Sequence, residues 1–229
     1  MAHNVGVAAQ QTRKQDRTRA GKFKNLPAIA KTPGGQWNLQ EELNFSDAAG
    51  SSNTSIDYGF PNGWDLGFSL VNVGLYSDPT TPLWDPSLLF NLEKSVQLHS
   101  RWHVVYGTQI GNAPWDPILS PRIEDFSYLD NQVSLPNDWG LAHAGAYYAN
   151  GAMSGNGSAI GYLIGISLPV RKGAGELVAD YVSGQNALSS LTLQLRWTLT
   201  PRLDIGLGVV LPAPGSSTPY TSLVGIYWH

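Results

Sequence analysis

The sequence contains no cysteine, few charged residues and no long apolar run. Without cysteine, the chain forms neither a disulfide scaffold nor a thiolate metal site. Charged residues make up 14% of the chain, against roughly 25% in an ordinary soluble domain. No segment approaches the run of about 18 apolar residues that a transmembrane helix needs. The N-terminal residues also lack the apolar core of about 7 to 15 residues found in a signal peptide, so we expect no intact signal peptide there.

The remaining charge is distributed unevenly along the chain. Residues 1–35 hold seven of the fourteen basic residues and a single acidic one, Asp16, which gives a net charge of +6. Residues 36–229 hold seven basic and sixteen acidic residues, which gives −9. We therefore expect two parts, a basic N-terminal arm of residues 1–35 and a mildly acidic domain of residues 36–229.

From residue 36 onward, apolar and polar residues alternate in stretches of about ten. Residues 191–211 show the pattern best: leucines and Trp197 alternate with polar residues, the pattern breaks at residues 200–202, and it then resumes. A period of two indicates an extended strand, and the break is typical of a tight turn, so this segment is predicted to be an antiparallel hairpin. Twelve such stretches and no convincing helix are found, the weakest strand candidate being residues 125–133. An even number of strands brings both ends of the domain to the same side.

The connections between these stretches also differ in length. Residues 60–63, 171–175 and 200–202 are short, whereas most of the intervening connections are longer and rich in Pro, Gly and Asn. Residues 183–187 are short and depart from this trend. Short turns on one rim and long loops on the other are typical of bacterial outer-membrane barrels.

The polar face of the predicted strands indicates which solvent the apolar face meets. A water-exposed sheet face is usually rich in Lys and Glu, but here Gly and Ser dominate, with single charges of both signs. We therefore predict an all-β, antiparallel up-and-down transmembrane β-barrel of about 12 strands in the bacterial outer membrane, with a soluble β-barrel binding protein as an alternative. Glu41 and Lys94 are exceptions, because both fall on the predicted lipid face. The charged or polar residues predicted to face the lumen are Asp57, Glu93, Arg101, His103, Glu176, Asp180, Arg196 and Asp204.

Aromatic residues near the strand ends support the membrane interpretation. Indole and phenol side chains prefer the boundary between hydrocarbon and headgroups. The predicted aromatic girdle consists of Trp37, Trp64, Trp102, Tyr162, Tyr181, Trp197, Tyr220 and Trp228.

The segments "YGFPNGWDLGFSL", "FNLEKSVQLHSRWHVVYGTQIG", "ELVADYVSGQNAL" and "LRWTLTPRLDIGLGVVLP" resemble those of uncharacterised bacterial outer-membrane β-barrel proteins. Some of these proteins are grouped as putative transporters of the meta-pathway of phenol degradation. The resemblance covers roughly residues 36–229 and lies in the style of the hairpins. It implies a twelve-stranded outer-membrane barrel and transfers no functional residues.

The sequence offers little that is typical of catalysis or metal binding. His99 and His103 would lie about 13 Å apart along a strand, too far for one metal ion. His99 and Ser100 are adjacent, so on a strand they would point to opposite faces and could not form a Ser–His pair. No hydrolase, P-loop or dinucleotide motif is present. We therefore predict no catalytic residues, no metal and no cofactor, and would test His103 and Asp180 first for any activity.

The predicted function is that of a narrow pore or transporter for small solutes, or of a structural barrel in a larger assembly. A lipid-modifying barrel enzyme is the alternative from another class. The expected partners are membrane lipid and, through residues 1–35, either the acidic lumen or an acidic periplasmic protein, unless the arm is a disordered tail. Nucleic acid is not an expected partner, since an exported chain seldom meets it. The solute and the oligomeric state do not follow from the sequence.

Overall fold

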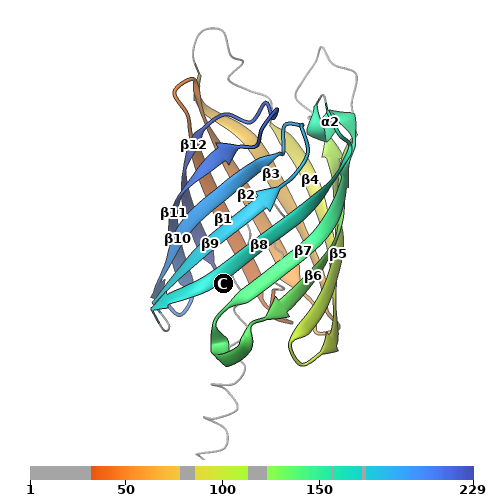
Figure 1. The fold of residues 1–229 in the computed structure, drawn as a ribbon, viewed down its shortest axis with the longest axis vertical. Helices are drawn as coiled ribbons and strands as arrows, with labels where there is room; N and C mark the ends of the chain where they lie inside the picture. The colour runs from red at the N-terminus through yellow and green to blue at the C-terminus, as the bar shows by residue number, and fades with distance from the viewer. Residues whose placement is uncertain (1–31, 78–85, 113–122, 156, 172–173) are drawn as a thin grey trace, which may run out of the picture.

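Twelve antiparallel strands close into one barrel in the computed structural model (Figure 1). The structure describes residues 32–77, 86–112, 123–155, 157–171 and 174–229. The predicted fold class is confirmed, and the weakest candidate, residues 125–133, lies within β6. The strands are β1 (Trp37–Phe45), β2 (Ala49–Gly59), β3 (Trp64–Ser77), β4 (Ser87–His99), β5 (Trp102–Asn112), β6 (Glu124–Ser134), β7 (Leu141–Ala149), β8 (Ile160–Arg171), β9 (Gly175–Val182), β10 (Ser190–Thr200), β11 (Leu203–Pro212) and β12 (Thr221–Trp228).

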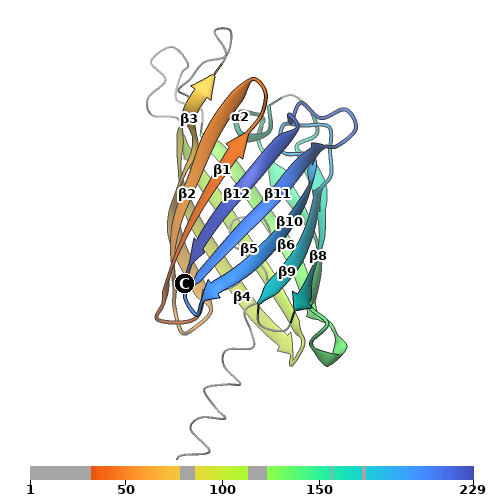
Figure 2. The same ribbon diagram turned by 90° about the vertical axis from the view of Figure 1, so that its left-hand side faces the viewer.

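Every strand pairs with its neighbours in the chain, and the first strand pairs with the last. Figure 2 shows β1 lying between β2 and β12. The β1–β12 register runs from Leu39 opposite Trp228 to Phe45 opposite Ser222. Closure leaves no unpaired strand edge, which is the condition for a sheet to cross hydrocarbon, where no water is present to satisfy backbone groups.

The hairpin predicted for residues 191–211 is confirmed. β10 and β11 pair from Ser190 opposite Pro212 to Thr200 opposite Leu203, with a bulge between Thr198 and Thr200. Only residues 201–202 form the turn. The same end of the barrel, at the bottom of Figure 1, holds residues 60–63 and 100–101 between strands; we call this end the terminal rim and the opposite end the loop rim.

Both ends of the described chain lie at the terminal rim, as the even strand number predicts. The amide of Gly35 donates to the carbonyl of Gly59, and the amide of His229 donates to the carbonyl of Arg202. Two short helical turns, η2 (Pro136–Asp138) and α2 (Gly151–Ser154), lie between strands. Among the described residues, no helix is long and apolar enough to cross a membrane.

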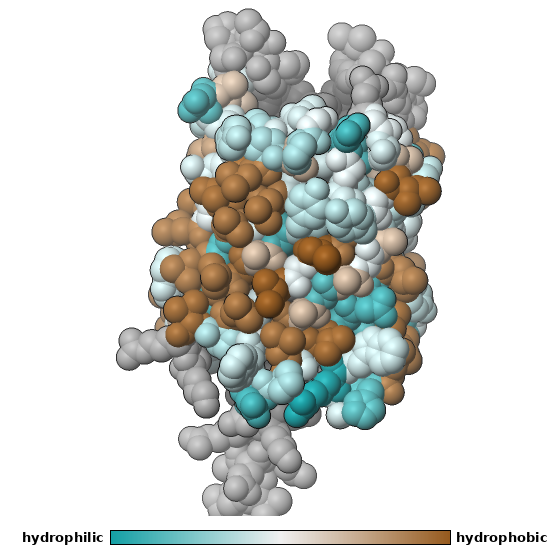
Figure 3. Space-filling view, in the orientation of Figure 1, coloured by the Kyte–Doolittle hydropathy of each residue, from teal (hydrophilic) through white to brown (hydrophobic). Residues whose placement is uncertain are grey.

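The apolar side of the strands faces outward. Figure 3 shows hydrophobic side chains gathered over the middle of the visible wall and hydrophilic ones along the lower rim. Phe68, Ile164 and Leu207, for example, are each about half exposed, whereas the alternating neighbours of such residues point inward and are shielded. A soluble barrel would have the opposite polarity, because its apolar side chains fill the core. The exterior is thus that of a barrel solvated by lipid.

The aromatic side chains predicted as a girdle divide between the two rims. Five tryptophans occupy strand ends at the terminal rim, and three tyrosines lie toward the loop rim. Tyr162 and Tyr181 contact each other there, with ring centroids 5.8 Å apart. The terminal-rim residues are Trp37, Trp64, Trp102, Trp197 and Trp228, and the loop-rim residues are Tyr162, Tyr181 and Tyr220.

The two charged residues predicted on the lipid face both have polar partners. The Glu41 carboxylate accepts hydrogen bonds from the Ser52 and Thr54 hydroxyls of β2. Lys94 Nζ donates to the carbonyl of Asn62 at the terminal rim and lies 5.1 Å from the centroid of the Trp64 ring. A long lysine stem that reaches the rim in this way is a snorkelling arrangement.

Leu207→Arg is expected to destabilise the bilayer-inserted barrel by about 2–4 kcal/mol, the cost of arginine at the middle of a lipid-facing strand. Leu207 is the fifth residue of the ten-residue strand β11 and points outward. The free energy of unfolding in liposomes, measured with urea, checks this, and Leu207→Ile is the matched control. An arginine variant as stable as the isoleucine variant would show that this face does not meet lipid.

Candidate functional site in the barrel interior

The interior of the barrel is lined by polar and charged side chains that are almost fully shielded from solvent. These side chains form three groups, and in each group the contacts join residues of different strands. Beside them lies an apolar cluster on β5 to β9, which the sequence did not predict for an interior expected to be small and polar. Its buried members are Val105, Phe126, Tyr128, Leu141, Tyr147, Ala149, Leu163, Val178 and Val182.

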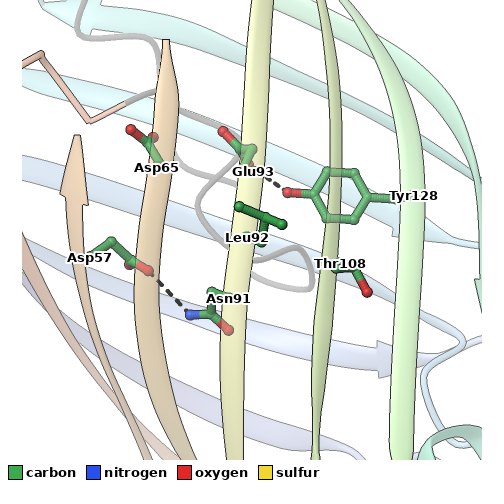
Figure 4. A pocket seen from close by; sticks show the side chains of 7 residues that line it. All are labelled: Asp57, Asp65, Asn91, Leu92, Glu93, Thr108 and Tyr128. Atoms are coloured by element: carbon green, nitrogen blue, oxygen red, sulfur yellow. Dashed lines mark hydrogen bonds between the residues drawn. The ribbon is translucent and has the colours of Figure 1, made fainter. Parts of the chain in front are cut away.

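The first group is an acidic cavity lined by residues of β2 to β6 (Figure 4). Asp57, Asp65 and Glu93 line it and are each no more than 6% exposed. Tyr128 Oη donates to Glu93 Oε2 at 2.5 Å, and Asn91 Nδ2 donates to Asp57 Oδ1 at 3.1 Å. The cavity volume of about 10 Å³ gives room for about one water molecule.

Glycines make room for this group. A Cβ on Gly67 would lie 2.1 Å from Asp57 Oδ1, and a Cβ on Gly107 would lie 2.6 Å from Tyr128 Oη. The glycines that interrupt the polar face of β3 and β5 therefore leave space for longer side chains on the adjacent strands.

The second group is a histidine placed between two aspartates. His143 of β7 lies with Nδ1 3.0 Å from Asp130 Oδ1 of β6 and with Nε2 3.5 Å from Asp180 Oδ1 of β9. All three side chains are fully buried. Gly165 of β8 stands opposite both His143 and Asp180 in the register, so no side chain separates them. Both ring nitrogens face carboxylates, an arrangement that suits the imidazolium, since only that form donates from both nitrogens.

The third group joins β10, β12 and β1. Arg196 Nη2 donates to Gln194 Oε1 at 3.0 Å, and the guanidinium carbon lies 4.2 Å from the centroid of the Tyr227 ring. Gln194 Nε2 donates to Tyr227 Oη at 2.7 Å, and Tyr227 Oη donates to Glu42 Oε1 at 3.0 Å. These contacts connect the only buried arginine of the described residues with a carboxylate on the other side of the β1–β12 seam.

Taken together, the buried ionisable side chains make the interior negative. Among the described residues, six acidic side chains are buried against one arginine and one histidine. Counted at formal charges with the histidine protonated, this buried set sums to −4, and buried charge of one sign is costly unless it is compensated. The six acidic residues are Glu42, Asp57, Asp65, Glu93, Asp130 and Asp180.

Seven of the eight residues predicted to face the lumen lie on the inward side. Asp57, Glu93, Asp180 and Arg196 are buried in the groups above. His103, Glu176 and Asp204 lie on inward positions and are partly exposed. Glu176 accepts from the Ser167 hydroxyl, and Asp204 Oδ2 lies 3.0 Å from His229 Nε2.

Two expectations about individual residues are corrected. Arg101 does not face the lumen: it is exposed in the turn between β4 and β5, where the chain has left the strand ladder and alternation no longer fixes direction. His99 and Ser100 do approach each other, with Ser100 Oγ 3.2 Å from His99 Nδ1, because Ser100 also belongs to this turn. Both side chains are exposed at the terminal rim.

Four of the central residues are absent from the set predicted to face the lumen: Glu42, Asp65, Asp130 and His143. The alternation of residues could have predicted that His143 faces inward, because Ala142 and Ala144 lie on the outward face of β7. Its aspartate partners belong to other strands, and their proximity depends on the register. Within the described ranges, no group of three or more His, Asp or Glu side chains is arranged to hold a metal ion.

Comparison with known proteins yields structural neighbours only. No family model and no curated protein matches the chain. Two solved structures of the KdgM porin are similar, one of them titled "KdgM porin in complex with disordered oligogalacturonate"; the TM-scores are 0.56 for this complex and 0.58 for the other, both at 12% identity. A NanC porin structure has a TM-score of 0.55 at 10% identity. Each alignment covers 84% of this chain and 98% of the other. At such low identity the likeness establishes the fold alone.

Proposed function

We propose that the protein is a bacterial outer-membrane barrel that forms a narrow, non-enzymatic pore for small solutes. The observation that carries this proposal is the polarity of the closed barrel, apolar outside and charged inside. A lipid-facing wall needs only the apolar exterior. A negatively charged interior with a cavity is useful chiefly for binding or passing a solute that enters the barrel.

We expect a narrow passage, because the barrel has only twelve strands. Barrels of 16 to 18 strands leave a wide aqueous channel, whereas side chains fill the interior of barrels of about eight strands, and this barrel lies between the two. The inward residues of the three groups are no more than 6% exposed. We therefore expect small single-channel conductance steps, far below those of a wide porin.

The net negative charge of the interior side chains favours cationic and neutral solutes over anions. An oligogalacturonate, present in one neighbouring structure, carries carboxylates that the interior of this barrel would repel. The resemblance to putative transporters of the phenol meta-pathway favours small aromatic solutes instead. That choice of solute stays a prediction, and uptake of a labelled phenol by proteoliposomes would test it.

Reconstitution in planar bilayers tests the pore and its selectivity. In a salt gradient, the reversal potential of the wild-type protein is expected to report cation preference, because the interior carries excess acidic side chains. The double variant Asp57→Asn/Glu93→Gln should reduce this preference without closing the pore. Glu41→Gln is the matched control, since it removes one acidic charge from the outer wall.

Two other functions give different results in the same preparation. A structural barrel, which the shielded side chains of the interior also fit, would show no discrete conductance steps in any variant. A lipid-modifying enzyme would show turnover of labelled phospholipid that is lost in Ser100→Ala, the hydroxyl that lies next to His99. A wild-type anion preference would contradict the proposed selectivity.

A further inference from the structure

We propose that the basic arm binds inside the barrel, against the buried acidic side chains, and narrows the pore. The arm here means residues 1–31, which lie outside the described part of the chain. This inference deepens the proposed function and rests on it, because the arm would regulate the same interior. The first experiment that tests this inference measures the rate of proteolysis of the arm and does not depend on conductance.

Thr32, the first described residue, lies on the inner side of the barrel wall. Thr32 is only 1% exposed, and its amide donates to Asp65 Oδ2 at 2.9 Å. Asp65 lines the acidic cavity. The residue that follows the arm is therefore already held on the inner side of the wall by one of the interior carboxylates.

Gly59 allows this close approach of the two backbones. A Cβ on Gly59 would lie 2.2 Å from the Thr32 carbonyl oxygen and 2.8 Å from that of Pro33. The amide of Gly35 also donates to the Gly59 carbonyl at 2.7 Å. The position of residues 32–35 is thus fixed by backbone contacts at the end of β2, where a residue larger than glycine would not fit.

Charge and length both suit the arm as the occupant. Residues 1–31 carry all seven basic residues of the N-terminal part and one acidic residue. The buried interior has the opposite sign, with six acidic side chains against one arginine and one histidine among the described residues. Fully extended, 31 residues span about 100 Å, several times the apolar band of about 25 Å of such barrels. The arm is therefore long enough to pass all three charged groups.

Limited proteolysis of the full-length protein tests the inference directly. Cleavage within residues 1–31 by a protease of broad specificity, followed by intact mass, measures how often the arm leaves the barrel. At low salt, the wild-type arm should be cut at least about tenfold more slowly than the arm of Asp57→Asn/Asp65→Asn/Glu93→Gln, equivalent to about 1.4 kcal/mol of binding. About 1 M salt, where the Debye length is about 3 Å, should remove most of the difference.

Two further variants separate charge from entry geometry. A full-length chain with Arg13, Lys14, Arg17, Arg19, Lys22, Lys24 and Lys31 replaced by Gln should lose protection although its barrel is unchanged. Gly59→Val should also lose protection, because the added side chain displaces Thr32. Glu41→Gln is the control and should keep the wild-type rate.

The outcomes are distinct for the two proposals. If the wild-type arm is cut at the same fast rate as in the variants, the arm does not occupy the interior, and a tail or a separate partner-binding segment replaces this inference. If the arm is protected, its neutral variant should also give larger conductance steps. Protection without conductance in any variant would support an occupied interior and overturn the pore.

Discussion

Replacing His143 with leucine is expected to lower the free energy of unfolding by about 3–5 kcal/mol, the cost of removing one partner from a buried ion pair. The imidazole lies between Asp130 and Asp180, and all three side chains are fully buried. Leucine leaves two buried carboxylates with no cation between them. Urea unfolding of the reconstituted barrel, followed by tryptophan fluorescence, measures the loss.

A second variant shows whether the loss is electrostatic. The triple variant His143→Leu/Asp130→Asn/Asp180→Asn removes every charge of the group and should recover most of the stability, because a neutral set no longer carries buried like charges. Equal losses in the single and triple variants would assign the effect to packing. A loss below about 1 kcal/mol, the value typical of a solvent-exposed pair, would contradict the buried ion-pair description.

Arg196→Met is expected to have the second largest effect, about 3 kcal/mol or more, because it removes the only buried arginine of the described interior. The substitution also removes the cation–π contact with Tyr227 and the hydrogen bond to Gln194. Methionine keeps most of the volume, so the loss reports charge and hydrogen bonding. The same urea experiment applies.

A double-mutant cycle with Glu42→Gln identifies the partner of the arginine. Glu42 is reached from Arg196 through Gln194 and Tyr227. If the two charges are coupled across the β1–β12 seam, the double variant should be more stable than the sum of the single losses predicts. Additive losses would show that the arginine acts without Glu42.

The fold was predictable because local patterns determine it. The β10–β11 hairpin follows from five apolar residues at every second position on each side of a two-residue turn. The tryptophans at the terminal rim follow from their places at strand ends. β6 was the weakest candidate because its inward face mixes Phe126 and Tyr128 with Asp130 and Gln132. Apolar and polar residues therefore do not separate cleanly between the two faces of this strand.

The site was predictable only in part, because its contacts cross the barrel wall. Alternation identified Asp57, Glu93, Asp180 and Arg196 as inward. It could not indicate that Asp180 meets His143, since that contact depends on the register of β7, β8 and β9 and on Gly165 between them. Arg101 was assigned to the wrong place because one residue at the end of β4 decides whether it belongs to a strand or to a turn.

The pairing of the first strand with the last has a consequence for the order of assembly. The hydrogen bond from Tyr227 to Glu42 joins residues 185 positions apart, so the contact forms only after the whole chain has been delivered. Such non-local pairing is slow, and both β1 and β12 expose a free edge until it occurs. During that interval the half-formed sheet is vulnerable to pairing with a second chain. A polypeptide segment that is to lie inside the barrel enters most simply before β1 pairs with β12, when the wall is still an open sheet.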